Sequence, residues 1–304
     1  MAPTVRKAAT LPAVLVLRRL DAPFAAALRE HFLLLDFHAS GETLPAFLAA
    51  AAAAAPEPPS AAVVVGGGAI RVDAPFLDAV PSVRCVVTTG TGVDHIDLAE
   101  CGRRGVGVAN AGKVYSADVA DHAVGLLLDV QRRVSAAERY VRRGSWPAQG
   151  DYRPLGSKLG GKRDGAARRY TYFPEVRGLA AASDVLVVAC ALNEETRHVV
   201  GREVLEALGK DGVLVNVGRG ANVDEAALVA ALKEGRIAGA GLDVFEDEPK
   251  VPAELLSMDN VVLTPHAAVL TQESRSDLRA QTIGNLQAFF SGQPLLTPVP
   301  CHRA

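Results

Sequence analysis

Three polar side chains stand near the ends of apolar runs late in the chain, and their types suggest chemistry on a small acid. Arg219 lies between two glycines in VNVGRG, Glu248 ends the acidic run FEDE, and His266 follows the run VVLTP. An arginine can bind a planar carboxylate through two parallel hydrogen bonds and polarise a neighbouring carbonyl. A carboxylate beside an imidazole raises the pKa of the ring, which then stays protonated and can act as a general acid. Each residue alone also fits an ordinary role, as a surface arginine, a loop acid or a capping histidine.

A glycine-rich segment earlier in the chain, residues 88–95 (TTGTGVDH), has the composition of a turn between a strand and a helix. Such a turn exposes backbone N–H groups at the positive end of a helix, where a carboxylate or a phosphate can bind. The alternative is an ordinary turn of this type with no ligand.

The elements that position these residues alternate between short β-branched runs and helical patterns, which is typical of parallel sheets covered on both faces. The predicted strands are 13–17, 32–36, 62–65, 84–88, 106–110, 184–190, 212–217, 238–244 and 261–265. The predicted helices are 23–30, 44–54, 74–80, 97–103, 202–208, 223–235 and 271–290, and the pattern is helical throughout 116–143. The pattern predicts an α/β protein with two parallel-sheet lobes. It also brings Arg219, Glu248 and His266 to one edge of the second sheet, where ligands of open α/β sheets gather.

Composition excludes several classes of protein. A length of 304 residues suggests two domains. The 32 basic residues against 34 acidic ones argue against nucleic-acid and anionic-membrane partners. Four cysteines without a C-x-x-C pair argue against a disulfide scaffold or a zinc site and favour the cytosol. The apolar run at 13–17 is too short for a membrane span, and we interpret it as the first strand rather than as part of a cleaved leader.

Several motifs together resemble one known family, the D-isomer-specific 2-hydroxyacid dehydrogenases, with most likeness to plant glyoxylate/hydroxypyruvate reductases and hydroxyphenylpyruvate reductases. They are GTGVDHIDL (90–98), ADVADHAVGLLL (117–128), SDVLVVACALNEETRHVV (183–200), VLVNVGRG (213–220), AGLDVFEDEP (240–249) and NVVLTPHAA (260–268). The resemblance implies a flavodoxin-like substrate domain over 1–110 and 270–304. It implies an incomplete Rossmann domain for the cofactor over 111–269.

The resemblance also implies reduction of small 2-keto acids by hydride transfer, with NADPH favoured over NADH. Arg219 is then expected to bind the substrate carboxylate and keto oxygen, His266 to give the oxygen its proton, and Glu248 to keep His266 charged. The amides of Thr91 and Gly92 are expected to receive the other side of the carboxylate. By their place in the family pattern, the residues expected at the nicotinamide and ribose are Leu192, Asn193, Thr196, Val217, Gly218, Arg219, Asp243 and His266.

Family members are commonly dimers built on the helices that follow residue 116, so the resemblance implies a homodimer. The only tryptophan, Trp146, comes just after these helices. It either closes the substrate cleft of a partner subunit or packs in the interface as an ordinary buried tryptophan.

One departure from the family pattern concerns the cofactor. These dehydrogenases carry G-x-G-x-x-G on the first strand–helix turn of the cofactor domain, where the pyrophosphate rests on backbone amides. Five Gly-x-Gly sequences occur here, and none has glycine or alanine at the sixth position; they begin at Gly66, Gly90, Gly105, Gly218 and Gly239. The segment GGKR (160–163), which precedes the motif in the family, is followed instead by DGAARRYTYFPEV.

The sequence therefore predicts a truncation near 163–170 that removes about 30 residues, the length of a strand–helix–strand unit. Arg168 and Arg169 are either remnants of a site for a 2'-phosphate or solvated charges. The truncation predicts weak dinucleotide binding or none, and a strand left without its ladder partner. Two other functions therefore stay open besides that of a reductase. The chain is either a non-catalytic scaffold or dimerisation partner, or a lobe that only binds a small molecule at residues 90–93.

Overall fold

The computed structural model describes residues 11–54, 57–66, 70–158 and 171–301. The chain forms two compact units. Unit 1 comprises Met1–Tyr115 with Thr271–Ala304, and unit 2 comprises Ser116–Leu270. These bounds lie within a few residues of the predicted lobes, and the assignment of substrate to one unit and cofactor to the other stays a prediction.

Unit 1 is built on a six-stranded sheet in the order β10-β5-β4-β3-β1-β2. Its strands are β1 (Ala13–Val16), β2 (Leu33–Asp36), β3 (Ala61–Val64), β4 (Cys85–Thr88), β5 (Gly107–Ala109) and the short β10 (Pro298–Val299). Strands β1 to β5 pair in parallel and only β10 is antiparallel. The order 2-1-3-4-5 is that of flavodoxin-like folds, which confirms the predicted fold class for this unit.

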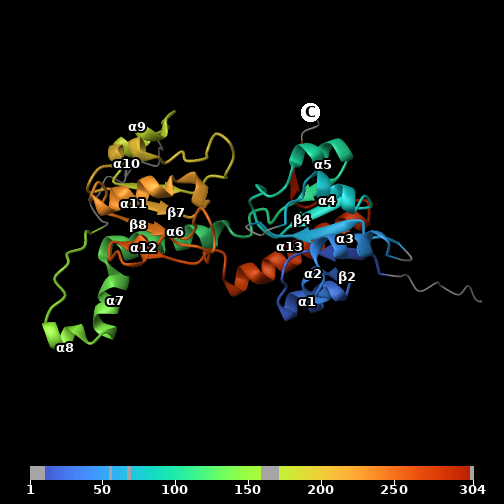
Figure 1. Ribbon diagram of the computed structural model, residues 1–304, viewed down its shortest axis with the longest axis horizontal. Helices are drawn as coiled ribbons and strands as arrows, with labels where there is room; N and C mark the ends of the chain where they lie inside the picture. The colour runs from blue at the N-terminus through green and yellow to red at the C-terminus, as the bar shows by residue number, and fades with distance from the viewer. Residues whose placement is uncertain (1–10, 55–56, 67–69, 159–170, 302–304) are drawn as a thin grey trace, which may run out of the picture. The chain divides into compact units, whose positions relative to one another are not determined.

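The helices of unit 1 begin where the sequence places capping residues. They are α1 (Ala22–Arg29), α2 (Phe37–Ser40), α3 (Leu44–Ala52), α4 (Ala74–Ala79), α5 (Leu98–Arg104) and α13 (Gln272–Phe290) (Figure 1). The side chains of Asp21, Asp73 and Asp97 accept backbone N–H groups of the first turns of α1, α4 and α5. Proline in the first turn of α1, α3 and α4 fits there because its missing N–H has no partner in a helix start.

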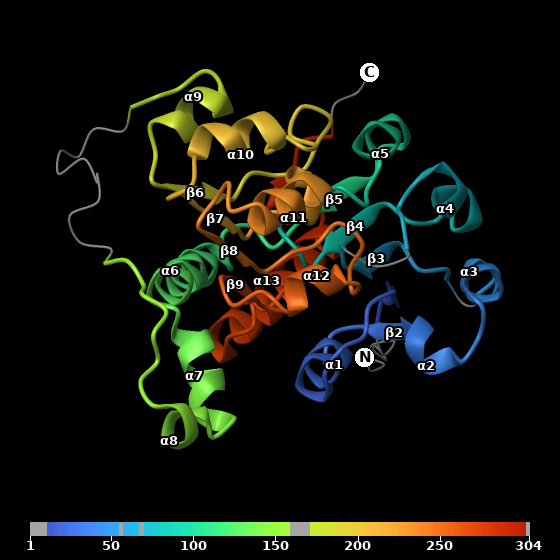
Figure 2. The ribbon, with the colours of Figure 1, turned by 60° about the vertical axis from the view of Figure 1, so that its left-hand side comes forward.

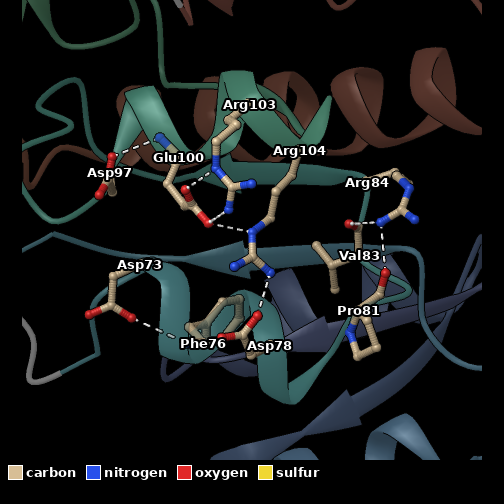
Figure 3. Close-up of polar contacts among 10 residues, drawn as sticks. All are labelled: Asp73, Phe76, Asp78, Pro81, Val83, Arg84, Asp97, Glu100, Arg103 and Arg104. Carbon is tan, nitrogen blue, oxygen red and sulfur yellow. Dashed lines mark hydrogen bonds and ion pairs between the residues drawn. The ribbon is translucent and has the colours of Figure 1, made fainter. Parts of the chain in front are cut away.

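An ion-pair network joins α4 to α5 (Figure 3). Glu100 accepts hydrogen bonds from Arg103 and Arg104, and Arg104 also bonds Asp78 on α4 at 2.7 Å. The two guanidinium groups lower the pKa of Glu100 to about 2, so the network stays charged at any physiological pH. It links α4 to α5, the helices that precede and follow β4 in the chain.

Unit 2 contains a four-stranded parallel sheet in the order β6-β7-β8-β9. The strands are β6 (Val185–Val188), β7 (Val213–Asn216), β8 (Gly239–Leu242) and β9 (Val261–Leu263). Helix α6 (Ser116–Arg132) packs on one face through Leu126 and Val130, which meet Val213 and Val215. The other face carries α9 (Val176–Ala181), α10 (Arg202–Leu208) and α11 (Glu225–Lys233) (Figures 1 and 2).

Strand β6 is the edge of this sheet. No described strand pairs with its outer side, and the Val187 side chain is 46% exposed in a strand otherwise made of valine and leucine. In a six-stranded dinucleotide-binding sheet, further strands would continue on this side. The predicted truncation near 163–170 falls on residues outside the described part, so the loss of a ladder partner stays a prediction.

The segment predicted to be helical throughout 116–143 forms two helices with a break between them. Helix α6 ends at Arg132, and α7 (Val134–Arg142) begins after Arg133, whose φ of +56° breaks the helix. Asp129 explains the break, since its carboxylate accepts both the backbone N–H and the hydroxyl of Ser135. Sequence patterns also missed the short helices α2, α8 (Ser145–Gln149), α9 and α12 (Ala253–Leu256). No helix of the described residues is both long and apolar enough to span a membrane.

Candidate active site

The loops that follow β7, β8 and β9 carry the three residues singled out by the sequence. Parallel strands end at the same edge of a sheet, so Arg219, Glu248 and His266 emerge side by side from neighbouring strands. Backbone hydrogen bonds join these loops directly: Asp243 N–H donates to the Asn216 carbonyl, and Thr264 N–H donates to the Leu242 carbonyl.

His266 and Glu248 form a direct hydrogen bond. His266 Nδ1 lies 2.9 Å from Glu248 Oε2, and the other oxygen, Oε1, accepts the Phe245 N–H at 3.1 Å. The side chains are 38% and 27% exposed, so the pair is partly shielded but open to a ligand. The second ring nitrogen, Nε2, has no hydrogen-bond partner within the described part of the chain. This geometry engages one ring nitrogen with the carboxylate and leaves the other available to a ligand.

The electrostatics of the pair favour a charged imidazolium. The hydrogen bond and the negative charge of Glu248 raise the pKa of His266, against the opposing effects of burial and of Arg219. Burial acts to raise the pKa of Glu248, but the contacts with His266 and the Phe245 N–H, together with the charge of Arg219, outweigh it and the pKa is lowered. A proton donor held charged near neutral pH is what a general acid needs.

Arg219 is held by hydrogen bonds within its own turn. Its N–H donates to Asn222 Oδ1 at 2.9 Å, its carbonyl accepts Asn216 Nδ2 at 2.9 Å, and its Nη1 donates to the Gly218 carbonyl. A side chain at Gly220 would meet the Phe245 carbonyl carbon at 1.9 Å, so only glycine lets this turn lie against the loop after β8. Because the charge of Arg219 affects the pKa of both His266 and Glu248, the three groups share one electrostatic site.

Asp243 follows β8 directly and is buried, with 1% of its surface exposed. Its carboxylate accepts the N–H groups of Ala267 and Ala268 and the hydroxyl of Thr264. His122 on α6 contacts the same Thr264 hydroxyl at 2.9 Å. Sequence reasoning gave no role to Thr264 or His122, although both lie inside motifs shared with the family.

The glycine-rich turn after β4 in unit 1 has two open donors. The Gly90 carbonyl accepts the Ala111 N–H, and the Thr91 carbonyl accepts Asn110 Nδ2 at 2.8 Å. These two hydrogen bonds join the turn to the segment that follows β5. No described residue accepts the N–H of Thr91 or of Gly92. Two neighbouring N–H groups without acceptors suit a carboxylate, as the sequence predicts for this turn.

The residues expected at the nicotinamide and ribose lie at the same edge of the sheet of unit 2 as the catalytic candidates. Leu192, Asn193 and Thr196 are on the loop after β6, where the Asn193 and Thr196 side chains bond each other's backbone N–H groups. Val217 and Gly218 follow β7, and a side chain at Gly218 would meet the Cys190 carbonyl at 2.9 Å. These residues fit the nicotinamide end of a dinucleotide, and their contact with a cofactor stays a prediction.

The glycine-rich turn after β7 does not suit the pyrophosphate end of a dinucleotide. Its N–H groups donate within the turn, because the Gly218 N–H donates to Asn216 Oδ1 and the Arg219 N–H donates to Asn222 Oδ1. The truncation predicted near 163–170 falls, like Arg168 and Arg169, outside the described residues. The described residues also contain no group of three or more His, Cys, Asp or Glu placed to hold a metal ion.

Comparison with known proteins identifies the family. A family model described as "D-isomer specific 2-hydroxyacid dehydrogenase, NAD binding domain" matches residues 158–268. Glyoxylate/hydroxypyruvate reductase HPR3 of Arabidopsis thaliana is 49% identical over 253 residues, covering 73% of this chain and 78% of the relative. This chain belongs to the D-isomer-specific 2-hydroxyacid dehydrogenase family. The hydroxyphenylpyruvate reductase of Plectranthus scutellarioides is 46% identical over 257 residues, covering 75% of this chain and 82% of the relative.

Solved structures of the 2-hydroxyacid dehydrogenase family share the fold. The NADPH-dependent glyoxylate/hydroxypyruvate reductase of Sinorhizobium meliloti, in complex with NADP and malonate, superposes with a TM-score of 0.83 at 34% identity. That comparison covers 97% of this chain and 100% of the other. The alignment with HPR3 spans 253 residues but takes in only 73% of this chain, about 222 of its 304 residues.

Proposed function

We propose that this chain reduces small 2-keto acids, glyoxylate and hydroxypyruvate, to 2-hydroxy acids with a nicotinamide cofactor, NADPH in preference to NADH. The plant and bacterial relatives are named as glyoxylate/hydroxypyruvate reductases, which supports the substrate class, and the S. meliloti enzyme is named as NADPH-dependent. The single observation that carries the proposal is the hydrogen bond between His266 Nδ1 and Glu248.

In the proposed reaction the cofactor supplies the hydride that reaches C2 of the keto acid. His266 gives its Nε2 proton to the keto oxygen, so the C=O group becomes CH–OH and the imidazole becomes neutral. Glu248 stabilises the charged ring before transfer, and Arg219 binds the substrate carboxylate and polarises the carbonyl. The N–H groups of Thr91 and Gly92 are proposed as further donors to the carboxylate.

We propose that the chain holds the dinucleotide weakly. The sequence contains no G-x-G-x-x-G, and the N–H groups of Gly218 and Arg219 in the turn after β7 already donate within the turn. The nicotinamide residues alone leave the two phosphates without a cradle of backbone N–H groups.

Exposed apolar side chains support the proposal of a homodimer. Val124 and Leu128 on α6, Val134 and Val141 on α7, and Trp146 on α8 are 41% to 57% exposed. Large exposed apolar residues on adjacent helices are typical of an interface between proteins. The cytosol is the proposed compartment, since the four cysteines are free in the structure.

The test measures initial rates with hydroxypyruvate while NADPH is raised stepwise. The chain is expected to turn over, with a rate that still rises above about 1 mM NADPH, beyond the ordinary range of KM values. His266→Gln is expected to lower kcat by about 10² to 10⁴. Arg219→Lys is expected to raise the KM for the keto acid, because lysine cannot form two parallel hydrogen bonds.

Two results would overturn parts of this proposal. Saturation at micromolar NADPH contradicts weak binding. Absence of turnover above background at every NADPH concentration contradicts the reductase and favours a non-catalytic scaffold or dimerisation partner.

A further inference from the structure

The backbone at His266 adopts a conformation that side chains rarely take. Its φ is +51°, in the left-handed region, and His266 is one of only three non-glycine residues of the described chain with a positive φ. Such a conformation persists only where surrounding contacts impose it. The contacts that impose it therefore decide where the imidazole points.

Asp243 supplies those contacts. Its carbonyl accepts the His266 N–H at 2.8 Å, its Oδ1 accepts the Ala267 N–H at 2.7 Å, and its Oδ2 accepts the Ala268 N–H at 3.0 Å. One buried residue thus binds three consecutive N–H groups around the left-handed position. Both oxygens of the Asp243 carboxylate must point toward the loop to accept the Ala267 and Ala268 N–H groups, so these contacts depend on the χ2 angle of Asp243.

Two further side chains fix that rotation. The Thr264 hydroxyl donates to Asp243 Oδ1 at 2.6 Å, which uses its only hydrogen. The Thr264 oxygen is then an acceptor for His122 Nε2–H, which lies 2.9 Å from it and 3.4 Å from Asp243 Oδ1. His122 belongs to α6, the helix packed on the sheet, so the chain of contacts anchors the loop to a rigid element.

We propose that His122 and Thr264 are positioning residues for His266 and act through the carboxylate of Asp243. They hold that carboxylate against the N–H groups of Ala267 and Ala268, which keeps Nδ1 of His266 on Glu248 and leaves Nε2 for the substrate. This inference rests on the proposed function for its role in turnover, but its structural part stands on the contacts alone.

The test compares Thr264→Val, which removes the hydroxyl at nearly constant shape, with Thr264→Ser, which keeps it. His122→Phe and His122→Gln form the corresponding pair, because glutamine still offers an N–H donor. His198→Gln is the matched control, since His198 contacts Glu246 at the same edge of the sheet and does not contact Asp243. The first readout is the titration of His266 by NMR of ¹³C-labelled histidine, which requires neither cofactor nor turnover.

Thr264→Val and His122→Phe are expected to move the pKa of His266 down, toward the ordinary value, because the ring leaves Glu248. They are expected to lower kcat for hydroxypyruvate about 10- to 100-fold while the KM for the keto acid changes less than about twofold. Thr264→Ser, His122→Gln and the control His198→Gln are expected to keep the parent values.

An unchanged His266 titration in Thr264→Val contradicts the proposal, even if the melting temperature falls, since that result shows a merely structural contact. Failure of Thr264→Ser to restore the titration contradicts it as well. If the parent chain shows no turnover but its His266 titration responds to Thr264→Val, the positioning role stands and only the proposed function fails.

Discussion

Replacing Glu248 by Gln removes one charge from the pair and keeps its shape, so it isolates the role of the carboxylate. Glu248 Oε2 lies 2.9 Å from His266 Nδ1, and hydrogen bonds to charged groups contribute about 1.5–3 kcal/mol. Both side chains are about one-third exposed, and solvent screening reduces the value to about 1–2 kcal/mol. We therefore expect kcat to fall about 5- to 30-fold at pH 8, since 1.4 kcal/mol corresponds to a tenfold change.

The pH dependence of this variant is the sharper readout. The pKa of His266 is raised by Glu248, so keto-acid reduction by the parent chain falls as the pH rises through that raised pKa. In Glu248→Gln the fall is expected at lower pH, and activity is expected to recover in part at pH 6, where the ring is protonated without help. Initial rates with hydroxypyruvate between pH 5.5 and 9 measure both effects.

Glu246→Gln is the matched control for Glu248→Gln. Glu246 lies two residues away on the same loop and contacts His198 instead of His266. It is expected to leave the pH profile unchanged. An identical inflection in the parent chain and in Glu248→Gln would refute the reasoning, because the carboxylate would then have no effect on the proton donor.

Three further predictions concern packing, assembly and cofactor binding. Gly220→Ala places a side chain at 1.9 Å from the Phe245 backbone. It is expected to lower the free energy of unfolding in urea by about 1–3 kcal/mol or more. Gly235→Ala is the control for backbone strain alone, because Gly235 has a φ of +66° but open surroundings. The double variant Val134→Asp/Val141→Asp is expected to halve the mass measured by light scattering, and an unchanged mass would count against a dimer built on these helices. Insertion of a strand–helix–strand unit with G-x-G-x-x-G after residue 163 is expected to tighten NADPH binding at least about 100-fold by calorimetry. The reason is that the unit supplies backbone N–H groups for the two phosphates. Equal NADPH affinity before and after the insertion would contradict the proposal that the parent chain binds the dinucleotide weakly.

The sequence predicted the fold class and every strand of the two main parallel ladders, because short β-branched runs with helical spacers leave few alternatives. It also brought Arg219, Glu248 and His266 together, since the ends of neighbouring parallel strands meet at one edge. The structure adds the distance between His266 and Glu248, which depends on the loop after β9 and follows from no local pattern.

Other features could not be predicted because they depend on contacts between distant parts of the chain. The break at Arg133 comes from the Asp129–Ser135 contact, which opposes a helical pattern that is continuous in sequence. The role of Thr264 depends on His122, 142 residues earlier in the chain, and the ADHAVG motif around His122 shows only the periodicity of a packed helix. The short helices α8 and α12 contain too few residues to establish a period.

The most direct measurement follows the fate of hydride and proton in a single reaction mixture. NADPH carrying deuterium at C4 of the nicotinamide is incubated at millimolar concentration with hydroxypyruvate and the purified chain, and the 2-hydroxy acid is analysed by mass spectrometry and NMR. We expect deuterium at C2 of the product with the parent chain and a loss of at least about 100-fold in product with His266→Gln. Deuterated product in equal yield from both chains, or none from the parent chain, would contradict it.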